Sequence, residues 1–323
     1  MTEIYFIKNN SEKWKRFEDL LSGNAKVDPD ELANLYIELN DDLAYSQTFF
    51  RKSRITGYLN SLIVKAHQMI YKNKKEDKGR LIRFWTEEIP LVVFHCRKEI
   101  IYSLIIFLIS VAIGVVSSAN DSGIPRLILG DNYVNMTIEN IKNGDPMAVY
   151  KSQPSFISFI GITFNNIRVS FMVFVTGIFF SAGTGYMLFS NGIMLGSFQY
   201  LFYQYGMLFN SAVAIWIHGT LEITAIIIAG GAGLVLGNSF LFPGSYSRLY
   251  SFRRGAVYGS KLIAGLIPVF AIAGFLEGFV TRNYQLSPFL GISIICLSLI
   301  FIALYFIYLP LKKSTGGESD GKS

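Results

Sequence analysis

The fold is decided by an apolar run that reads Ala212-Val-Ala-Ile-Trp-Ile-His-Gly-Thr-Leu-Glu-Ile-Thr-Ala-Ile-Ile-Ile-Ala229. A helix needs about 20 such residues to cross the hydrocarbon core of a bilayer, so this run with its flanks predicts a transmembrane helix. His218 and Glu222 interrupt the run four residues apart, which places both side chains on one face of that helix. An ionisable group at membrane depth costs roughly 3 kcal/mol or more unless it has a partner or faces a polar cavity. The run therefore predicts both a span and a polar site within it.

The rest of the chain divides by composition. Hydrophobic residues make up 51% of the sequence and charged residues only 16%, whereas soluble domains carry about a quarter charged residues. The deficit is local, because residues 1–99 hold 17 Lys/Arg and 15 Asp/Glu, an ordinary soluble composition. We therefore predict a cytoplasmic helical domain at 1–98, a transmembrane domain at 99–310 and a disordered cytoplasmic tail at 311–323.

The N-terminal domain is predicted to be a small soluble helical bundle. Trp14, Phe17 and Leu21 form one helical stripe. A second helix is expected to begin with Asp28 as N-cap and Pro29 at its first position. A third runs through residues 58–70. No strand-like alternation persists here, so the fold class is all-α.

Six apolar segments predict six transmembrane helices, at 100–119, 168–190, 192–210, 212–236, 257–280 and 289–309. Basic residues cluster before the first span, between the fourth and fifth, and after the sixth. By the positive-inside rule, both termini then lie in the cytoplasm and the protein is a multi-pass membrane protein. Loop 120–167 then lies on the opposite side of the membrane, outside the cytoplasm. Its apolar end, 155–164, is too short to span and is expected to form an interfacial or re-entrant helix that leads into the second span.

Glycines recur through the apolar segments, where small residues let membrane helices approach closely. Two GxxxG spacings stand out. The glycines expected at helix contacts are Gly192, Gly196, Gly219, Gly233 and Gly237.

A second intramembrane carboxylate, Glu277, is expected at a depth similar to that of His218, so a shared cavity can contain both carboxylates. The candidate intramembrane polar site consists of His218, Glu222, Glu277, Asn165, Asn166, Arg168 and Asn191. One interpretation is a hydrogen-bonded cluster that only holds helices together. The other is a site that handles protons, ions or a substrate, in which a buried carboxyl carries a proton and the imidazole shuttles one. Arg168, at the start of the second span, is either an interfacial residue or a partner of the two glutamates.

Catalytic signatures are weak. Zinc at His218 and Glu222 would need a third ligand, for which Glu277 is the anionic candidate, so an intramembrane metal hydrolase ranks last among the hypotheses and the metal stays open. The sequence contains no phosphate-binding loop and no Ser-His-Asp set. We expect that the protein is not an enzyme and that it binds no cofactor. Without a dense basic stripe, nucleic acid is not an expected partner. Cys96 and Cys296 belong to no CxxC pair and are expected to be buried or interfacial thiols.

Five motifs in order resemble the stage II sporulation protein M family. They read Phe164-Asn-Asn-Ile-Arg-Val, Gly183-Thr-Gly-Tyr-Met-Leu-Phe-Ser-Asn-Gly-Ile-Met-Leu-Gly196, His218-Gly-Thr-Leu-Glu222, Ile228-Ala-Gly-Gly-Ala-Gly-Leu234 and Phe275-Leu-Glu-Gly-Phe279. With features of the N-terminal domain, the resemblance covers about residues 10–310. It implies an integral protein of the bacterial inner membrane that works with peptidoglycan-remodelling proteins, or beside a MoxR-type ATPase. Asn165, Asn166, Asn191, His218, Glu222 and Glu277 are the motif positions carried over, and no catalytic role comes with them.

The sequence thus leads to two hypotheses of different class. The first is an inner-membrane subunit or scaffold of an envelope-associated complex, a homodimer in the bilayer that docks through its N-terminal domain. The alternative is a proton- or ion-coupled transporter or channel-like protein that uses His218, Glu222 and Glu277.

Overall fold

The structure of the chain is a computed structural model that describes residues 2–21, 29–72, 79–145, 148, 154–282 and 288–316. Every regular element in these residues is helical, and they contain no strand. The predicted all-α class is therefore confirmed. Contacts divide the chain into two compact units, Met1–Arg80 and Leu81–Ser323.

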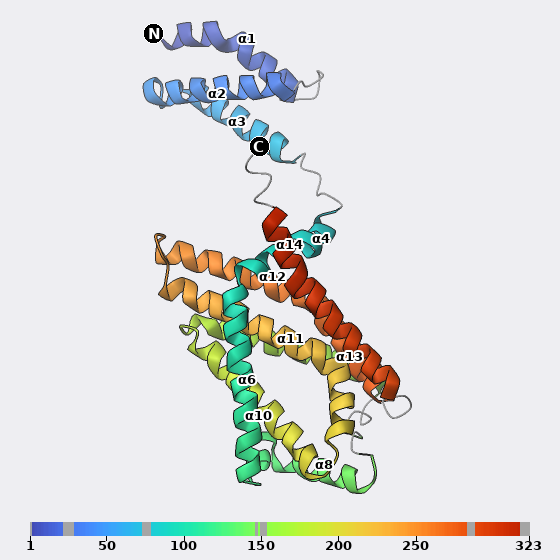
Figure 1. Cartoon of the computed structure of the whole chain (residues 1–323). Helices are drawn as coiled ribbons and strands as arrows, with labels where there is room; N and C mark the ends of the chain where they lie inside the picture. The colour runs from blue at the N-terminus through green and yellow to red at the C-terminus, as the bar shows by residue number, and fades with distance from the viewer. Residues whose placement is uncertain are drawn as a thin grey trace. The chain divides into compact units, whose positions relative to one another are not determined.

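The first unit consists of three helices, α1 (Glu3–Leu21), α2 (Pro29–Phe49) and α3 (Arg54–Lys72) (Figure 1). Trp14 and Phe17 of α1 are almost fully buried against Leu39 of α2 and Leu59 of α3, so the expected stripe faces a shared core. The Nε1 atom of Trp14 donates a hydrogen bond of 2.8 Å to Asp42, which satisfies the indole N–H. The expected N-cap, Asp28, lies outside the described residues.

The second unit holds the remaining helices, several of which contain π-helical turns. Their bounds are α4 (Arg80–Arg83), η1 (Phe84–Glu88), α5 (Ile89–His95), α6 (Arg97–Asn120), α7 (Ile124–Leu129), α8 (Asp131–Lys142), α9 (Ser155–Val175), η3 (Thr176–Ile178), α10 (Ala182–Gln204), α11 (Leu208–Leu241), α12 (Arg248–Phe275), η4 (Leu276–Val280), α13 (Pro288–Ile302), η6 (Ala303–Tyr308) and α14 (Leu309–Gly316). Residues 81–95, which we assigned to the N-terminal domain, pack here: Ile89 and Val92 share a core with Leu262 and Phe270 of α12. In the predicted disordered tail, residues 311–316 are helical and 317–323 lie outside the described residues.

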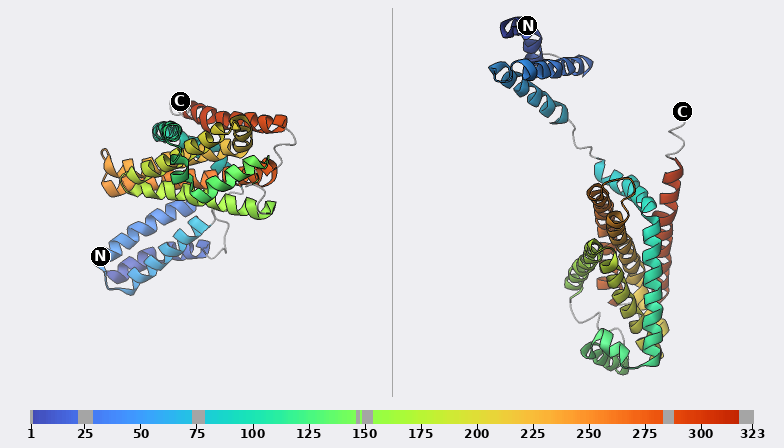
Figure 2. Two further views of the ribbon diagram at one scale, coloured as in Figure 1. Left: turned by 90° about the horizontal axis from the view of Figure 1, so that it is seen from below. Right: turned by 90° about the vertical axis from the view of Figure 1, so that its left-hand side faces the viewer.

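Helix α11 is the centre of this unit. It packs against α6, α9, α10, α12 and α13, and 72% of its most apolar stretch is buried, against 11% for the span from Pro288 to Thr315. Helices α8 and α14 lie at opposite ends of the unit (Figures 1 and 2). A helix that is apolar on all sides and buried on all sides is expected at the middle of a bundle. The stretch that decided the fold is therefore its core.

Five helical stretches are long and apolar enough to cross a membrane, Arg97–Asn120, Ser155–Ile178, Leu208–Leu241, Arg248–Val280 and Pro288–Thr315. A multi-pass helical protein is thus supported, but the predicted count of six spans is not confirmed. The difference is α10, which has 23 residues and no charge but lower hydropathy, and which packs between α6 and α11.

Two sequence-based boundaries were wrong. Residues 155–164 do not form a separate interfacial or re-entrant helix, because α9 runs unbroken from Ser155 to Val175. The predicted break between the second and third spans, at residue 191, was also wrong. The chain turns at Phe179–Ser181, where Phe180 and Ser181 adopt positive φ angles of 54° and 65°. No glycine, proline or asparagine marks that turn in the sequence. It is held by tertiary contacts, since Ser181 Oγ lies 3.3 Å from the carbonyl oxygen of Leu234 on α11.

Four of the five expected glycines lie where helices touch. At Gly192 an added Cβ would meet the Ser110 side chain of α6 at 2.5 Å, and at Gly196 it would collide with the Val111 carbonyl of the same helix. Gly233 and Gly237 face the Thr184 hydroxyl and Ser181 in the same way. Gly219 does not lie at a contact between helices, because the atoms nearest to a Cβ there belong to Ile215 and Ile223 of its own helix.

Candidate functional site

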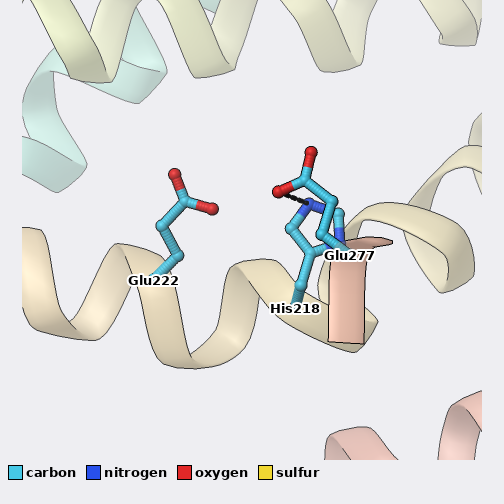
Figure 3. Close-up of side chains that lie close together, drawn as sticks. All are labelled: His218, Glu222 and Glu277. Carbon is cyan, nitrogen blue, oxygen red and sulfur yellow. Dashed lines mark ion pairs between the residues drawn. The ribbon is translucent and has the colours of Figure 1, made fainter. Parts of the chain in front are cut away.

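His218 and Glu222 project from the same side of α11, as their spacing predicts (Figure 3). His218 is about 15 Å along the helix from Leu208, taking 1.5 Å per residue. The helix around it is fixed by fully buried neighbours such as Ile217 and Ala214. His218 and Glu222 therefore lie on the most buried of the five membrane-length stretches.

Glu277 reaches this site from a distorted helix. It lies in η4, the π-helical turn that continues α12 from Leu276 to Val280. A π-turn inserts one extra residue and changes the direction of the side chains around it, and such turns are frequent at functional sites. The next residue, Gly278, is buried against α9, where a Cβ would meet the Ser155 carbonyl oxygen at 3.0 Å. The π-helical turn thus places Glu277 next to α9.

The three side chains converge without forming a close hydrogen-bonded pair. His218 Nε2 lies 3.7 Å from Glu277 Oε2, which is beyond the usual range of a hydrogen bond. The other ring nitrogen, Nδ1, lies 3.0 Å from the hydroxyl of Thr281. One ligand atom from each of His218, Glu222 and Glu277 lies within 4.8 Å of the other two.

Helix α9 closes one side and leaves a cavity. The cavity measures about 440 Å³ and is lined by Gly161, Ile162, Asn165, Asn166, His218, Glu222 and Glu277. Asn166 is 5% exposed, and its Nδ2 atom has no hydrogen-bond partner of normal geometry although the amide lies near the Glu222 carboxyl. A buried amide donor without a partner is costly, roughly 1–3 kcal/mol. The cavity thus contains polar groups on several sides, one of which is unsatisfied.

Two of the predicted site residues lie elsewhere. Asn191, on α10, donates its side-chain hydrogen bond to the Met187 carbonyl of its own helix at 2.8 Å. Arg168 was expected to open the second span, but it lies beyond the middle of α9, is exposed and does not line the cavity. The misplacement follows from the wrong start assigned to that span.

Two residues near the site were not predicted. Thr281 is fully buried and follows Glu277 by four positions, the same spacing that singled out His218 and Glu222, so this signal was present in the sequence. Tyr133 belongs to α8, in the long connection between α6 and α9. Burial raises the pKa of Tyr133 to about 12, and the nearby Glu277 carboxyl adds to the rise. No local pattern links Tyr133 to Glu277, because the sequence does not show where α8 packs.

The arrangement suits a small cation. Two carboxylates and an imidazole bring one ligand atom each within 4.8 Å of one another, and an apolar surrounding strengthens their attraction for positive charge. Carboxylate oxygen and imidazole nitrogen are also common metal ligands. The same groups could exchange protons with a bound solute.

Comparison with known proteins identifies two regions. Residues 103–282 match the family model described as Stage II sporulation protein M, and residues 5–72 match a Domain of unknown function (DUF8413). Neither a curated protein nor a solved structure matches the chain. The first match begins within α6, ends after η4 and includes every residue that lines the cavity. The resemblance predicted from the motifs is confirmed: this chain is a membrane protein that belongs to the Stage II sporulation protein M family.

Proposed function

We propose that this protein is an ion-coupled transporter or channel-like protein whose cation site is the cavity between α9, α11 and η4. The observation that carries the proposal is the cavity itself. A cluster made only to hold helices together would satisfy its polar atoms internally, as buried networks do. Here His218 and Glu277 stop short of a hydrogen bond, the Nδ2 atom of Asn166 has no hydrogen-bond partner of normal geometry, and the cavity that these residues line measures about 440 Å³. This shifts the balance from a fastening role towards ligand handling.

Charge supports the same conclusion. Glu222 and Glu277 bring two carboxyl groups into one apolar region, and the other ionisable group lining the cavity is the imidazole of His218. Two like charges so close repel each other in a medium of low dielectric. A bound cation relieves that repulsion, which explains why carboxylates inside membranes commonly mark ion pathways.

The test is flux through the purified protein in proteoliposomes loaded with dyes for H⁺, K⁺, Na⁺ and Zn²⁺, each under an imposed gradient. We expect flux of at least one of these cations above empty vesicles, lost in Glu222→Gln and in Glu277→Gln. Glu139→Gln, which changes an exposed carboxylate on α8, is the matched control and should retain it. Absence of flux for all four cations in the parent protein would reject the proposal, as would equal flux in all variants.

The first unit favours a second role. It has its own hydrophobic core and matches a domain family separate from the membrane region. We propose that it docks an envelope-associated partner at the inner membrane, so that the protein is also a scaffold. Photo-crosslinking in native membranes tests this. We expect the same adduct from crosslinkers at the exposed Tyr5 of α1 and Ile37 of α2, and not from one at the exposed Phe289 of α13. Absence of this adduct at α1 and α2, or its appearance from Phe289, would contradict the docking role.

A further inference from the structure

We propose that the cavity binds one divalent transition-metal cation, with His218 Nε2 and one carboxylate oxygen each from Glu222 and Glu277 as ligands. This inference rests on the proposed function and names the class of cation. It assigns no hydrolytic reaction to the site.

The spacing of the donor atoms supports this ligand set. Zinc binds imidazole nitrogen at about 2.0–2.1 Å and carboxylate oxygen at about 2.0–2.2 Å, so two tetrahedral ligands lie roughly 3.4 Å apart. His218 Nε2 and Glu277 Oε2 lie 3.7 Å apart, and one ligand atom from each of the three residues lies within 4.8 Å of the other two. Glutamate side chains have enough rotational freedom to close the remaining distance without moving the helices.

The orientation of the His218 imidazole also suits metal binding. When its Nδ1–H donates to Thr281, the ring presents the Nε2 lone pair toward Glu277. A cation between His218 Nε2 and the Glu277 carboxylate would then accept a lone pair from each. Metal-binding histidines almost always use their other nitrogen in a hydrogen bond that fixes the ring. Thr281 supplies that bond.

The charge of the ligands and the unpartnered Nδ2 atom of Asn166 also support this ligand set. Two carboxylates neutralise a divalent cation, and neutrality is the condition under which a metal site is tolerable in an apolar surrounding. Three protein ligands leave a position open on a tetrahedral ion. The unpartnered Nδ2 of Asn166 lines the same cavity and can donate to a water or to a solute held at that open position.

The experiment uses the full chain, purified in detergent without a histidine tag and stripped with a chelator. Cys96→Ala and Cys296→Ala are introduced first, because free thiols also bind zinc. After equilibrium dialysis against Zn²⁺ we expect about one ion per chain. Glu277→Gln, Glu222→Gln and His218→Ala should each weaken binding by at least about 100-fold, while Glu139→Gln and His95→Ala bind like the parent.

A second measurement guards against misfolded variants. Co²⁺ bound to the parent protein should show the intense visible absorption of a four-coordinate ion and should lose it on addition of Zn²⁺. Glu277→Asp keeps a carboxylate and should retain part of the binding. Zinc bound no better than to empty micelles, or equally well by every variant as an adventitious ion only, would overturn the inference.

Failure of this inference and failure of the proposed function give different results. Flux of H⁺, Na⁺ or K⁺ that depends on Glu222, without zinc binding, supports the ion-coupled function and rejects the metal. Zinc binding at one per chain without flux of any cation supports the metal and rejects transport.

Discussion

Thr281 and His218 are joined across two helices: the Thr281 hydroxyl lies 3.0 Å from His218 Nδ1, while the other ring nitrogen, Nε2, lies 3.7 Å from Glu277 Oε2. Thr281 comes directly after the π-helical turn that carries Glu277. One distorted segment thus both presents a carboxylate to the imidazole and holds that imidazole in place. This linkage makes Thr281 a positioning residue for the site.

Removing this hydroxyl should weaken metal binding. Thr281→Val keeps the shape of the side chain but leaves Nδ1 without its partner, and loss of such partners typically costs about 10–100-fold in metal affinity. Competition for Zn²⁺ with a coloured chelator measures the change. Thr281→Ser retains the hydroxyl and should bind like the parent. Equal affinity for the Val and Ser variants would show that Thr281 does not position the ring.

The contact between α10 and α6 should be intolerant of a single methyl group. At Gly196 an added Cβ collides with the backbone carbonyl of Val111, which cannot rotate away, so we expect Gly196→Ala to cost about 1–3 kcal/mol of unfolding free energy. Gly185 is the control in the same helix, because nothing lies within 4 Å of a Cβ there. Gly185→Ala should be neutral or slightly stabilising. Unfolding in mixed detergent micelles gives both values, and equal stability of the two variants would contradict the packing described.

Cys96 should react slowly with thiol reagents. Burial raises the pKa of Cys96 to about 12, and the Glu99 charge adds to the rise, so very little thiolate exists at neutral pH. Because the thiolate is the nucleophile, iodoacetamide should modify Cys96 at least about 100-fold more slowly than a cysteine introduced at the exposed Ser61. The rate should rise about tenfold per pH unit until pH approaches the pKa of Cys96. The measurement is made in the Cys296→Ala background, and comparable rates at the two positions would refute it.

The first unit should lose stability in alkali. Burial raises the pKa of Tyr58 to about 12, helped by its hydrogen bond to Glu18 and by the charge of that carboxylate. The protonated phenol is therefore favoured in the folded state. Its stabilising contribution is complete below about pH 10, the ordinary tyrosine value, and is lost as pH rises from about 10 to about 12.

Burial also raises the pKa of Tyr133 to about 12, so NMR of tyrosine-labelled protein should show more than one titration near pH 12. One of them should disappear in Tyr58→Phe and persist in Tyr5→Phe, a change on the exposed surface of α1. Unfolding of the first unit in Tyr58→Phe should depend less on pH between about 10 and 12 than in the parent. The same pH dependence in both proteins would contradict the role of Tyr58.

The elements read most accurately from the sequence were those with a strong local signal. The apolar runs around Ala214 and Val269 predicted α11 and α12. The four-residue spacing of His218 and Glu222 predicted that both lie on one face of α11. These features follow from helix geometry and hydropathy, which neighbouring residues determine by themselves. The family followed from the same motifs.

The errors arose where distant residues decide the outcome. Phe179–Ser181 contains no glycine, proline or asparagine, and the chain bends there because Ser181 bonds to α11. Asn165 and Asn166 were taken for the end of a loop, yet α9 continues through them because a cavity accommodates their amides. Arg168 was then misplaced by the same error.

The sequence by itself determined that this is an all-helical membrane protein of the Stage II sporulation protein M family and which helix bears the polar pair. Only the tertiary structure decided that the carboxyl of Glu277 meets that pair, that Thr281 orients His218 and that Asn191 stays apart. Hydropathy and helical period act over a few residues, whereas the site depends on helices that are distant along the chain: His218 and Thr281 are 63 residues apart. No local pattern records how such helices pack.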